Sequence, residues 1–259
     1  MNILCIDVGN TRTHYGIVNE QTVLETGHFH TKHFRSSASG LFSQQLTPLL
    51  KQVDGIAYCS VVPAINSNLL ASLPQNDLPV FHLTHFNCNG LNIDYPKPEE
   101  IGQDRLASAI AAKHYYNIPA IILDMGTAIT LDVVSSTGYE GGIIAPGLAL
   151  MTRYLHEETA LLPKIEESNL QNVTGYIGKS TAHAMQLGAT IGFTGMIDAL
   201  IERVFTELKA RTKEDPTLLL TGGNVTHLNS KWAQAFKLVE NLTLIGLAAA
   251  FRFRNNTKD

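Results

Sequence analysis

The 259-residue sequence predicts an α/β protein made of two duplicated halves. Strand-like apolar runs alternate with helix-like segments along the chain, as is typical of an α/β layer structure. Near the N-terminus an apolar run ends in Asp-Val-Gly-Asn-Thr, and far downstream a second one ends in Asp-Met-Gly-Thr-Ala. The aspartates of these motifs, Asp7 and Asp124, lie 124 − 7 = 117 residues apart. Self-similarity on that scale favours a duplicated domain over a short solenoid repeat.

The first half, near residues 1–117, is expected to begin with a three-stranded meander. Its first two apolar runs are separated by Gly-Asn-Thr-Arg-Thr, and glycine with asparagine between extended segments favours a hairpin. Apolar runs predict strands over 2–7, 14–18, 22–31, 55–62 and 79–84, and helical periodicity predicts helices over 41–53, 64–73 and 103–116. A loop with two prolines and two glycines, residues 88–102, precedes the last of these helices.

The second half, near residues 118–259, repeats the meander over 120–147. Further elements are predicted as helices over 148–156, 181–210 and 244–253, and as a strand over 217–221 that runs into two glycines. The apolar stretch 242–251 has about half of the ~20 residues that a membrane span requires, so we expect a buried final helix and no membrane partner.

Composition excludes several classes of protein. Hydrophobic residues make up 44% of the chain and charged residues 16%, which favours a large core over disorder. The net charge of −4 and the lack of a lysine or arginine run argue against a nucleic-acid partner. The three cysteines, Cys5, Cys59 and Cys88, form no CxxC pair, so we expect neither disulfides nor a zinc site, and a cytoplasmic location. The N-terminal run lacks a basic segment and is interrupted by Asp7, so we expect no signal peptide.

The repeated Asp-x-Gly turn suits a phosphate-binding site. The aspartate ends a buried strand, and the glycine allows a positive φ and a close approach of a ligand to the backbone. Successive N–H groups in such a turn form a concavity that binds anions, while the carboxylate can hold a cation or its waters. Two such turns facing each other would hold a polyphosphate–metal complex. A single Asp-x-Gly turn is also common in ordinary hairpins, so the argument depends on the two matching copies.

A third motif is the strand and glycine pair in Leu-Leu-Leu-Thr-Gly-Gly-Asn, residues 218–224. Paired glycines allow a flat ligand such as a nucleobase or a ribose to lie against bare backbone. The alternative is an ordinary tight turn.

Together these motifs resemble the phosphate 1, phosphate 2 and adenosine motifs of the actin-like ATPase superfamily. The resemblance implies two duplicated ribonuclease H-like domains, 1–117 and 118–259, with a central cleft. Within that superfamily the chain resembles the type III pantothenate kinases. The motifs that carry this resemblance are DVGNT (7–11), GQDR (102–105), DMGTAITLD (124–132), GGIIAPG (141–147), GKST (178–181) and TGGN (221–224).

The family resemblance implies the activity and its cofactors. Family members transfer the γ-phosphate of ATP to the primary hydroxyl of pantothenate and form 4'-phosphopantothenate, in the first step of coenzyme A biosynthesis. They use magnesium with ATP and a monovalent cation, potassium or ammonium, and they are homodimers. The helices that begin at Thr181 and Gln103 are candidates for the dimer surface.

The resemblance also implies residue roles. For ATP these are Asp7, Val8, Gly9, Asn10, Thr11, Arg12, Thr13 and His14 in the first turn, Thr127 in the second, and Gly222 and Gly223. Asp7 would act on magnesium through water, and Asp124 would hold the monovalent cation. His14 stands where some relatives have a lysine.

Asp104 is the implied catalytic base, and the implied substrate-binding residues are Tyr95, Gly102, Gln103, Asp104, Arg105 and Thr181. Local sequence leaves simpler interpretations open. Asp104 could be an acidic residue that favours a helix start, Tyr95 an exposed loop aromatic and Thr181 an ordinary N-cap. Asp132 is interpreted as a group that supports a ligand-contacting residue or, by a small margin, as an ordinary hairpin residue.

Two alternative functions remain. Another small-molecule kinase of the same fold, such as a sugar kinase, would share the ATP motifs and differ only at the acceptor residues. A transcriptional accessory factor is the non-enzymatic alternative, although DNA binding would favour a basic surface. His28 and His30 share one face of a predicted strand, with His33 nearby, but without an accompanying carboxylate or cysteine they favour a solvated face over a zinc site.

Overall fold

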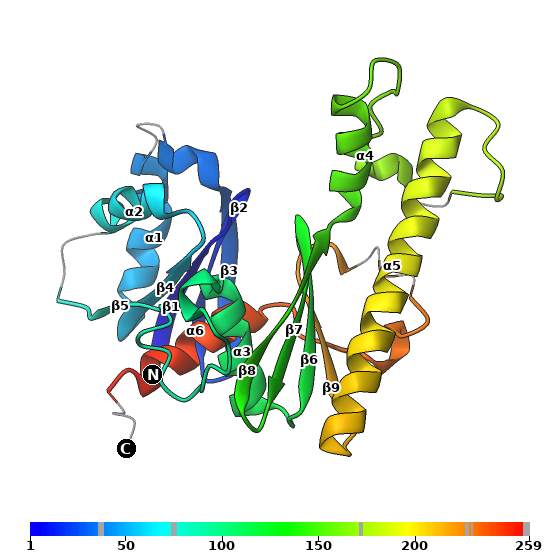
Figure 1. Ribbon diagram of the computed structural model, residues 1–259. Helices are drawn as coiled ribbons and strands as arrows, with labels where there is room; N and C mark the ends of the chain where they lie inside the picture. The colour runs from blue at the N-terminus through cyan, green and yellow to red at the C-terminus, as the bar shows by residue number, and fades with distance from the viewer. Residues whose placement is uncertain (36–38, 74–76, 171–172, 226–227, 229, 256–259) are drawn as a thin grey trace. The chain divides into compact units, whose positions relative to one another are not determined.

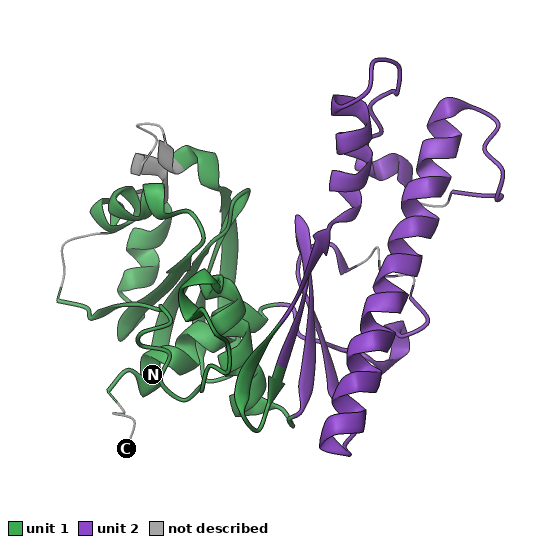
Figure 2. Ribbon diagram, in the orientation of Figure 1, with its two compact units in different colours: residues 1–118, 134–141, 241–259 green, residues 119–133, 142–240 purple. Residues whose placement is uncertain are grey.

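The computed structural model describes residues 1–255 except 36–38, 74–76, 171–172, 226–227 and 229, and within these limits it contains two five-stranded sheets with helices packed on them (Figure 1). The chain forms two compact units (Figure 2). Unit 1 comprises residues 1–118, 134–141 and 241–259, and unit 2 comprises residues 119–133 and 142–240.

The first sheet has its most buried strand at the centre. Its strands are β1 (Asn2–Val8), β2 (Arg12–Asn19), β3 (Thr22–His30), β4 (Gly55–Ser60) and β5 (Val80–His82), in the order β3-β2-β1-β4-β5. β1 pairs antiparallel with β2 and parallel with β4, and its residues 3–6 have no exposed surface. A strand enclosed in this way can present a carboxylate only near its end, where Asp7 lies.

The second sheet repeats this topology. Its strands are β6 (Ala120–Met125), β7 (Ala128–Ser135), β8 (Gly138–Pro146), β9 (Thr217–Thr221) and β10 (Lys237–Leu238). Their order, β10-β9-β6-β7-β8, matches that of the first sheet when it is read in reverse. β6 therefore corresponds to β1, and the parallel pairs β6–β9 and β9–β10 correspond to β1–β4 and β4–β5. Asp124 occupies the same topological place as Asp7.

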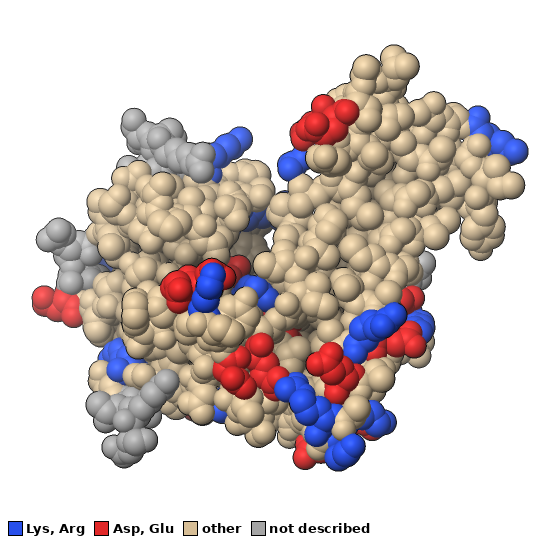
Figure 3. All heavy atoms as spheres, viewed as in Figure 1, with Lys and Arg blue, Asp and Glu red and all other residues tan. Residues whose placement is uncertain are grey.

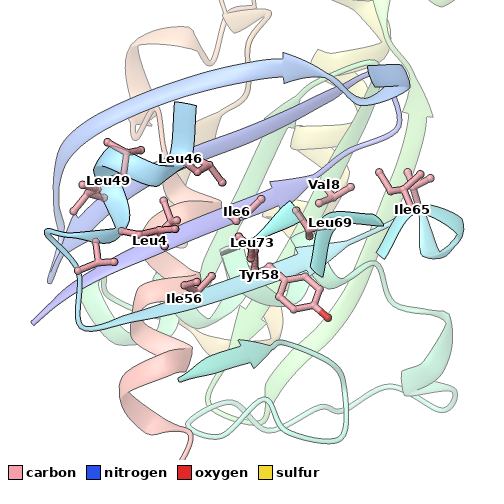
Figure 4. Packing of buried hydrophobic residues seen from close by; sticks show 14 residues of the cluster. Leu4, Ile6, Val8, Leu46, Leu49, Ile56, Tyr58, Ile65, Leu69 and Leu73 are labelled. Atoms are coloured by element: carbon pink, nitrogen blue, oxygen red, sulfur yellow. The ribbon is translucent and has the colours of Figure 1, made fainter. Parts of the chain in front are cut away.

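Unit 1 closes its core with helices on both sides of the sheet. They are α1 (Ser39–Leu50), α2 (Asn66–Ser72), α3 (Gln103–Tyr115) and α6 (Leu242–Phe253), with the short 3₁₀ helices η1 (Thr31–Arg35), η2 (Pro63–Ile65) and η3 (Pro98–Glu100). Leucines of α1 and α2 pack on the apolar side chains of β1 and β4 (Figure 4). Burial of these side chains is the main source of stability of the unit.

The last helix of the chain packs in unit 1, although the sequence halves place it with the second domain. Residues 244–251 of α6 are all buried, and the helix packs on α3 and β1. A Cβ at Gly246 would lie 1.8 Å from the carbonyl oxygen of Ala107 in α3, so the two helix backbones touch at this glycine. Only the first segment of unit 1 ends near the predicted boundary at 117, at Ile118, whereas its other segments, 134–141 and 241–259, lie in the second half of the sequence.

Unit 2 is built on the second sheet and one long helix. Its helices are α4 (Leu148–Glu157) and α5 (Thr181–Thr212), with η4 (Glu167–Leu170) and η6 (Ala233–Ala235). Phe193, Ile197 and Ile201 of α5 belong to the unit's apolar core. By length and composition alone α5 could cross a membrane, a property that core helices of soluble proteins share.

Candidate active site

The first Asp-x-Gly turn is a tight hairpin held by neighbouring backbone. The Gly9 N–H donates to the Arg12 carbonyl oxygen at 3.0 Å, and a Cβ at Gly9 would lie 2.8 Å from the same oxygen. Thr31, which follows β3, donates its hydroxyl to the Gly9 oxygen at 2.7 Å and its N–H to the Thr11 oxygen at 3.0 Å. The turn therefore needs glycine at position 9 and has its backbone fixed from two sides.

Residues of this turn differ in what they can offer a ligand. Asn10, Thr11 and Arg12 are exposed. Val8 is part of the core, and the Thr13 hydroxyl is buried 3.0 Å from the Thr31 hydroxyl, so a ligand at this turn could meet these two residues only through their backbone.

His14 contributes no positive charge at neutral pH. Its ring lies 5.7 Å from that of His28 on the adjacent strand. Burial, and then the charges of His28 and Arg12, lower the pKa of His14 below its ordinary value near 6.5. At pH 7 the imidazole is therefore neutral, and it cannot replace the charge of a lysine at this position.

A buried thiol contacts Asp7 and lies within reach of the charge of Asp104. Cys59 on β4 lies opposite Asp7 on β1, and its Sγ donates to Asp7 Oδ1 at 3.4 Å. Burial raises the pKa of Cys59 well above the ordinary thiol value, and the charges of Asp7 and Asp104 raise it further. Asp104, from the first turn of α3, thus acts electrostatically on the same thiol as Asp7. No local pattern predicts this contact, because it joins residues 52 positions apart.

Gly102 leaves room for the Asp104 carboxylate. Its φ of −56° is ordinary, so its backbone conformation does not require glycine. A Cβ at Gly102, however, would lie 2.5 Å from Asp104 Oδ1. The same oxygen accepts the Arg105 N–H at 2.8 Å, in the first turn of α3, where the helix dipole favours an ionised carboxylate. Gly102 therefore determines where the carboxylate can sit.

Gln103 ties the start of α3 to the sheet. Its Oε1 accepts the Ser60 N–H at 2.8 Å, which identifies this atom as the amide oxygen because a backbone N–H can only donate. His82 Nε2 lies 2.9 Å from the same oxygen and must therefore carry its proton there. The His82 ring stacks on Tyr58 at 4.3 Å. Gln103 has a structural role that the sequence did not predict, and its predicted contact with substrate stays a prediction.

Tyr139 lies between two predicted substrate residues. It is 1% exposed, its ring centroid is 6.3 Å from that of Tyr95, and the Arg105 guanidinium carbon lies 5.9 Å from its centroid. Gly141, with φ +112°, lies under Tyr95, since a Cβ there would be 3.1 Å from the Tyr95 ring. The aromatic pair and the arginine therefore form one group in unit 1. Tyr139 was not predicted as a site residue, because nothing in the surrounding sequence GYEGG indicates a contact with Tyr95 or Arg105.

The second Asp-x-Gly turn resembles the first in its backbone bonding. The Gly126 N–H donates to the Ala128 oxygen at 3.2 Å, and the Gly147 N–H donates to the Thr127 oxygen at 3.2 Å. A Cβ at Gly147 would lie 2.4 Å from that Thr127 oxygen. The exposed Thr127 is thus held against the start of α4, with its backbone fixed in place.

The Thr-Gly-Gly-Asn loop is fastened to this second turn. Gly222 has φ +102°, and a Cβ on it would lie 2.5 Å from Asp124 Oδ1 and 2.6 Å from the Met125 backbone. Asn224 donates its N–H to the Met125 oxygen at 2.9 Å and its Nδ2 to the Gly126 oxygen at 3.2 Å. The predicted cation-binding and nucleotide-binding residues of unit 2 therefore meet, and Asn224, which had no predicted role of its own, connects them.

The remaining candidates lie apart from these groups. Thr181 is exposed at the first position of α5, and Ser180 is the N-cap, because its Oγ accepts the His183 N–H at 3.1 Å. The simpler interpretation of Thr181 as the N-cap is therefore wrong, and its contact with substrate remains a prediction. Asp132 is buried on β7 and accepts the Thr130 hydroxyl at 3.1 Å.

His28 and His30 are exposed on β3, opposite His14 and Arg12. The described residues contain no group of three or more histidine, cysteine or acidic side chains arranged to hold a metal ion. The exposure of His28 and His30 agrees with a solvated strand face.

Comparisons with known proteins were made over the whole chain. The family model for type III pantothenate kinase matches residues 3–203. A type III pantothenate kinase of Akkermansia muciniphila is 35% identical over 253 residues, which cover 96% of this chain and 98% of that protein. The chain also resembles solved structures at the level of fold. A Campylobacter jejuni protein described as a Baf family transcriptional activator has a TM-score of 0.60 at 17% identity, covering 98% of this chain and all of that one.

A ROK family glucokinase of Streptomyces griseus, solved with glucose and AMPPNP, has a TM-score of 0.55 at 11% identity and covers 97% of this chain and 99% of that one. At these sequence identities the two structures indicate a shared fold and nothing more. They agree with two domains of the kind that actin-like ATPases and sugar kinases contain.

We expect Gly222→Ala to destabilise the protein by about 2–4 kcal/mol, because it adds a strained positive φ to a steric clash with backbone. Gly223→Ala is the matched control, since a Cβ at Gly223 would have no heavy atom within 4 Å and its φ is not positive. Urea unfolding of both variants measures the difference. Equal stabilities would show that the loop is not held against Asp124 as described.

Proposed function

We propose that three groups of residues, around Cys59, Tyr139 and Asp124, carry out the reaction of this chain. The chain belongs to the type III pantothenate kinase family and phosphorylates pantothenate with ATP in coenzyme A biosynthesis. The observation that supports the proposal most directly is that one buried thiol contacts Asp7, while the charge of Asp104 also raises the pKa of that thiol. This brings the proposed magnesium-binding carboxylate and the proposed base to the same corner of unit 1.

Binding of ATP with a divalent metal is proposed to begin at the first turn. The residues fit such a group, because magnesium prefers oxygen ligands and usually keeps waters between itself and one or two carboxylates. Asp7 supplies a carboxylate there, beside a turn whose exposed Asn10, Thr11 and Arg12 can donate to phosphate oxygens. When bound, magnesium supplies charge neutralisation on the phosphates.

Asp104 is proposed to accept the proton of the pantothenate hydroxyl. As the hydroxyl oxygen forms its bond to the γ-phosphorus, the bond from that phosphorus to the β-γ bridging oxygen breaks, and ADP leaves. Phosphoryl transfer depends mainly on positioning and charge stabilisation, so a weak carboxylate base is sufficient. The N-terminus of α3 favours the ionised form of Asp104, and the missing side chain of Gly102 leaves space for the carboxylate.

Recognition of the acceptor is proposed for Tyr95, Arg105 and Thr181, with the Gly102 and Gln103 backbone. Arg105 is suited to the carboxylate of pantothenate because a guanidinium can bind a carboxylate through two hydrogen bonds. Tyr139 supports the side chains of both Tyr95 and Arg105, so it would act on substrate through them.

Residues of unit 2 are proposed to bind the nucleotide and the monovalent cation. Asp124 would hold potassium or ammonium, Thr127 would contact ATP, and Gly222 with Gly223 would accept the nucleoside. Support comes from the Thr-Gly-Gly-Asn loop, which Asn224 holds directly against the turn of Asp124.

The comparisons support the pantothenate kinase activity more strongly than either alternative function. Likeness to a glucokinase extends to the fold at 11% identity, whereas likeness to a pantothenate kinase extends along 96% of the chain at 35% identity. The transcription-factor alternative likewise has the support of a fold match alone, at 17% identity.

We further propose a cytoplasmic homodimer. Large apolar side chains are exposed on unit 2, including Leu161 (91%), Tyr176 (90%) and Ile191 (52%). The upper part of unit 2 shows few charged atoms on the face in Figure 3, whereas charges of both signs gather toward the lower end of α5. An apolar surface of this kind fits a second copy of the chain. α3 is less suited to the contact because its residues 106–112 are buried within unit 1.

We expect Asp104→Asn to fold normally and to lose turnover by about 10²–10⁴-fold, since it cannot accept the hydroxyl proton. The assay is ATP-dependent phosphorylation of pantothenate, with a panel of sugars as alternative acceptors. Glu99→Gln, at an exposed carboxylate of the preceding η3 helix, is the control and should retain full activity. Full activity of Asp104→Asn would remove Asp104 from the mechanism, and phosphorylation of a sugar in preference to pantothenate would overturn the proposed acceptor.

Gly102→Ala tests whether the position of the Asp104 carboxylate matters, because this variant keeps the charge of Asp104 and changes only its position. The added methyl displaces the Asp104 side chain, which is flexible, so we expect stability within ~0.5 kcal/mol of wild type and a loss of kcat of about tenfold to a hundredfold. A variant with unchanged kcat would show that the carboxylate need not occupy the observed place.

The monovalent-cation proposal predicts a higher rate in potassium than in sodium. Asp124→Asn should raise the half-saturating potassium concentration by about tenfold or more, because a contact with a charged ligand is lost. Initial rates measured over a potassium titration test this expectation. Equal rates of the wild-type protein in the two salts would rule out a specific potassium site.

Ile191→Glu should convert the dimer to monomers at micromolar concentration, because it places a charge in the apolar contact. Leu24→Glu is matched in exposure, at 56%, and lies on β3 of unit 1, so it should leave the dimer intact. Sedimentation velocity distinguishes the two species. A wild-type monomer would contradict the dimer, and an unchanged Ile191→Glu dimer would exclude this surface.

A further inference from the structure

Cys59 and Asp7 form a pair that the sheet itself holds in place. The two residues lie opposite each other in the parallel β1–β4 pair, and Cys59 is completely buried. Their Cα atoms are fixed by the central strands of the first sheet, so the separation of 3.4 Å between Sγ and Oδ1 follows from the register. A one-residue slip of β4 would turn the Cys59 side chain to the other face of the sheet and break its contact with Asp7.

The thiol can act here only as a hydrogen-bond donor. The Cys59 Sγ lies 3.4 Å from Asp7 Oδ1, and a carboxylate oxygen accepts hydrogen bonds, so the thiol is the donor of this contact. An S–H group beside a carboxylate donates its hydrogen to the oxygen and takes up part of its hydrogen-bonding capacity.

We propose that Cys59 is a positioning residue that fixes the Asp7 carboxylate in the orientation needed to bind magnesium–ATP. The inference rests on the proposed role of Asp7 in the kinase reaction. Cys59 touches neither substrate in this scheme, and it acts by restricting the side-chain rotation of Asp7, so that less conformational freedom is lost when the metal–nucleotide complex binds.

A second thiol provides a matched control. Cys5 is completely buried two residues before Asp7 on β1, and its Sγ donates to the Ile3 carbonyl oxygen at 3.7 Å. Cys5→Ala removes a buried thiol from the same sheet without removing a contact to Asp7. Any general effect of losing a thiol from this core should therefore appear in both alanine variants.

The hydrogen bond is tested first without any ligand, by the S–H stretching band in Raman spectra. The difference between wild type and Cys59→Ser isolates the Cys59 band. We expect this band at lower wavenumber than that of an unbonded thiol, and a shift to higher wavenumber in Asp7→Asn, whose neutral amide oxygen is a weaker acceptor. A Cys59 band that does not move in Asp7→Asn would overturn the inference, whatever the enzyme activity.

The consequence is tested by calorimetric binding of AMPPNP, with and without magnesium and in the absence of pantothenate. Cys59→Ala should weaken binding of the magnesium complex by about three- to tenfold, the loss expected for one hydrogen bond. Cys59→Ser should bind more tightly than Cys59→Ala because a donor is restored, and Cys5→Ala should bind like wild type. The KM for pantothenate should be unchanged in all three.

The outcomes separate the two proposals. A Cys59→Ala variant that binds the magnesium complex as tightly as Cys5→Ala would overturn the positioning role, even if the wild-type enzyme phosphorylates pantothenate. A wild-type protein that binds no magnesium–AMPPNP and phosphorylates no pantothenate would overturn the proposed function, while the Raman experiment would still decide whether the thiol holds Asp7.

Discussion

The site depends on a single constraint, which is that each sheet has a buried central strand ending in an aspartate and a glycine turn. β1 and β6 have neighbours on both sides, and their apolar residues fill the cores of the two units. A carboxylate on such a strand is tolerated only near its end, where polar partners are within reach. The glycines that follow let the chain reverse within a few residues, and in both turns the glycine N–H donates to a carbonyl oxygen across the turn.

The position of Asp104 relative to this strand end depends on residues at the far end of the chain. α6 packs its backbone directly on α3 at Gly246, which fixes the axis of α3 on the sheet. Gln103 then ties the first turn of α3 to the end of β4 through Ser60. The carboxylate of Asp104 is thus held by a helix contact, a side-chain hydrogen bond and the space left by Gly102, and removal of any of these would move the proposed base while leaving its chemistry intact.

The sequence predicted the parts of the fold that local patterns encode. Every strand with an apolar run, from β1 to β9, was expected within a few residues, because burial and turn chemistry both leave a local signal. β10 was missed because it has two exposed residues, Lys237 and Leu238. The roles of Cys59 and Asn224 were missed for a different reason: each depends on a partner more than 50 residues away, which appears only when the strands are paired.

The two sheets share a topology, but different groups lie beside their aspartates. Asp7 faces Cys59 in its parallel neighbour, and Asp124 faces Thr221 at the equivalent place. The thiol of Cys59 donates to its aspartate, whereas the Thr221 hydroxyl donates away from Asp124, to the Glu240 oxygen at 3.5 Å. The Gly222 backbone approaches Asp124 instead. The Cys59 thiol lies beside one carboxylate and the Gly222 backbone lies beside the other, so the duplicated scaffold places different groups next to its two aspartates. This difference agrees with the separate cations proposed for them, a magnesium ion that keeps its waters at Asp7 and a larger monovalent ion at Asp124.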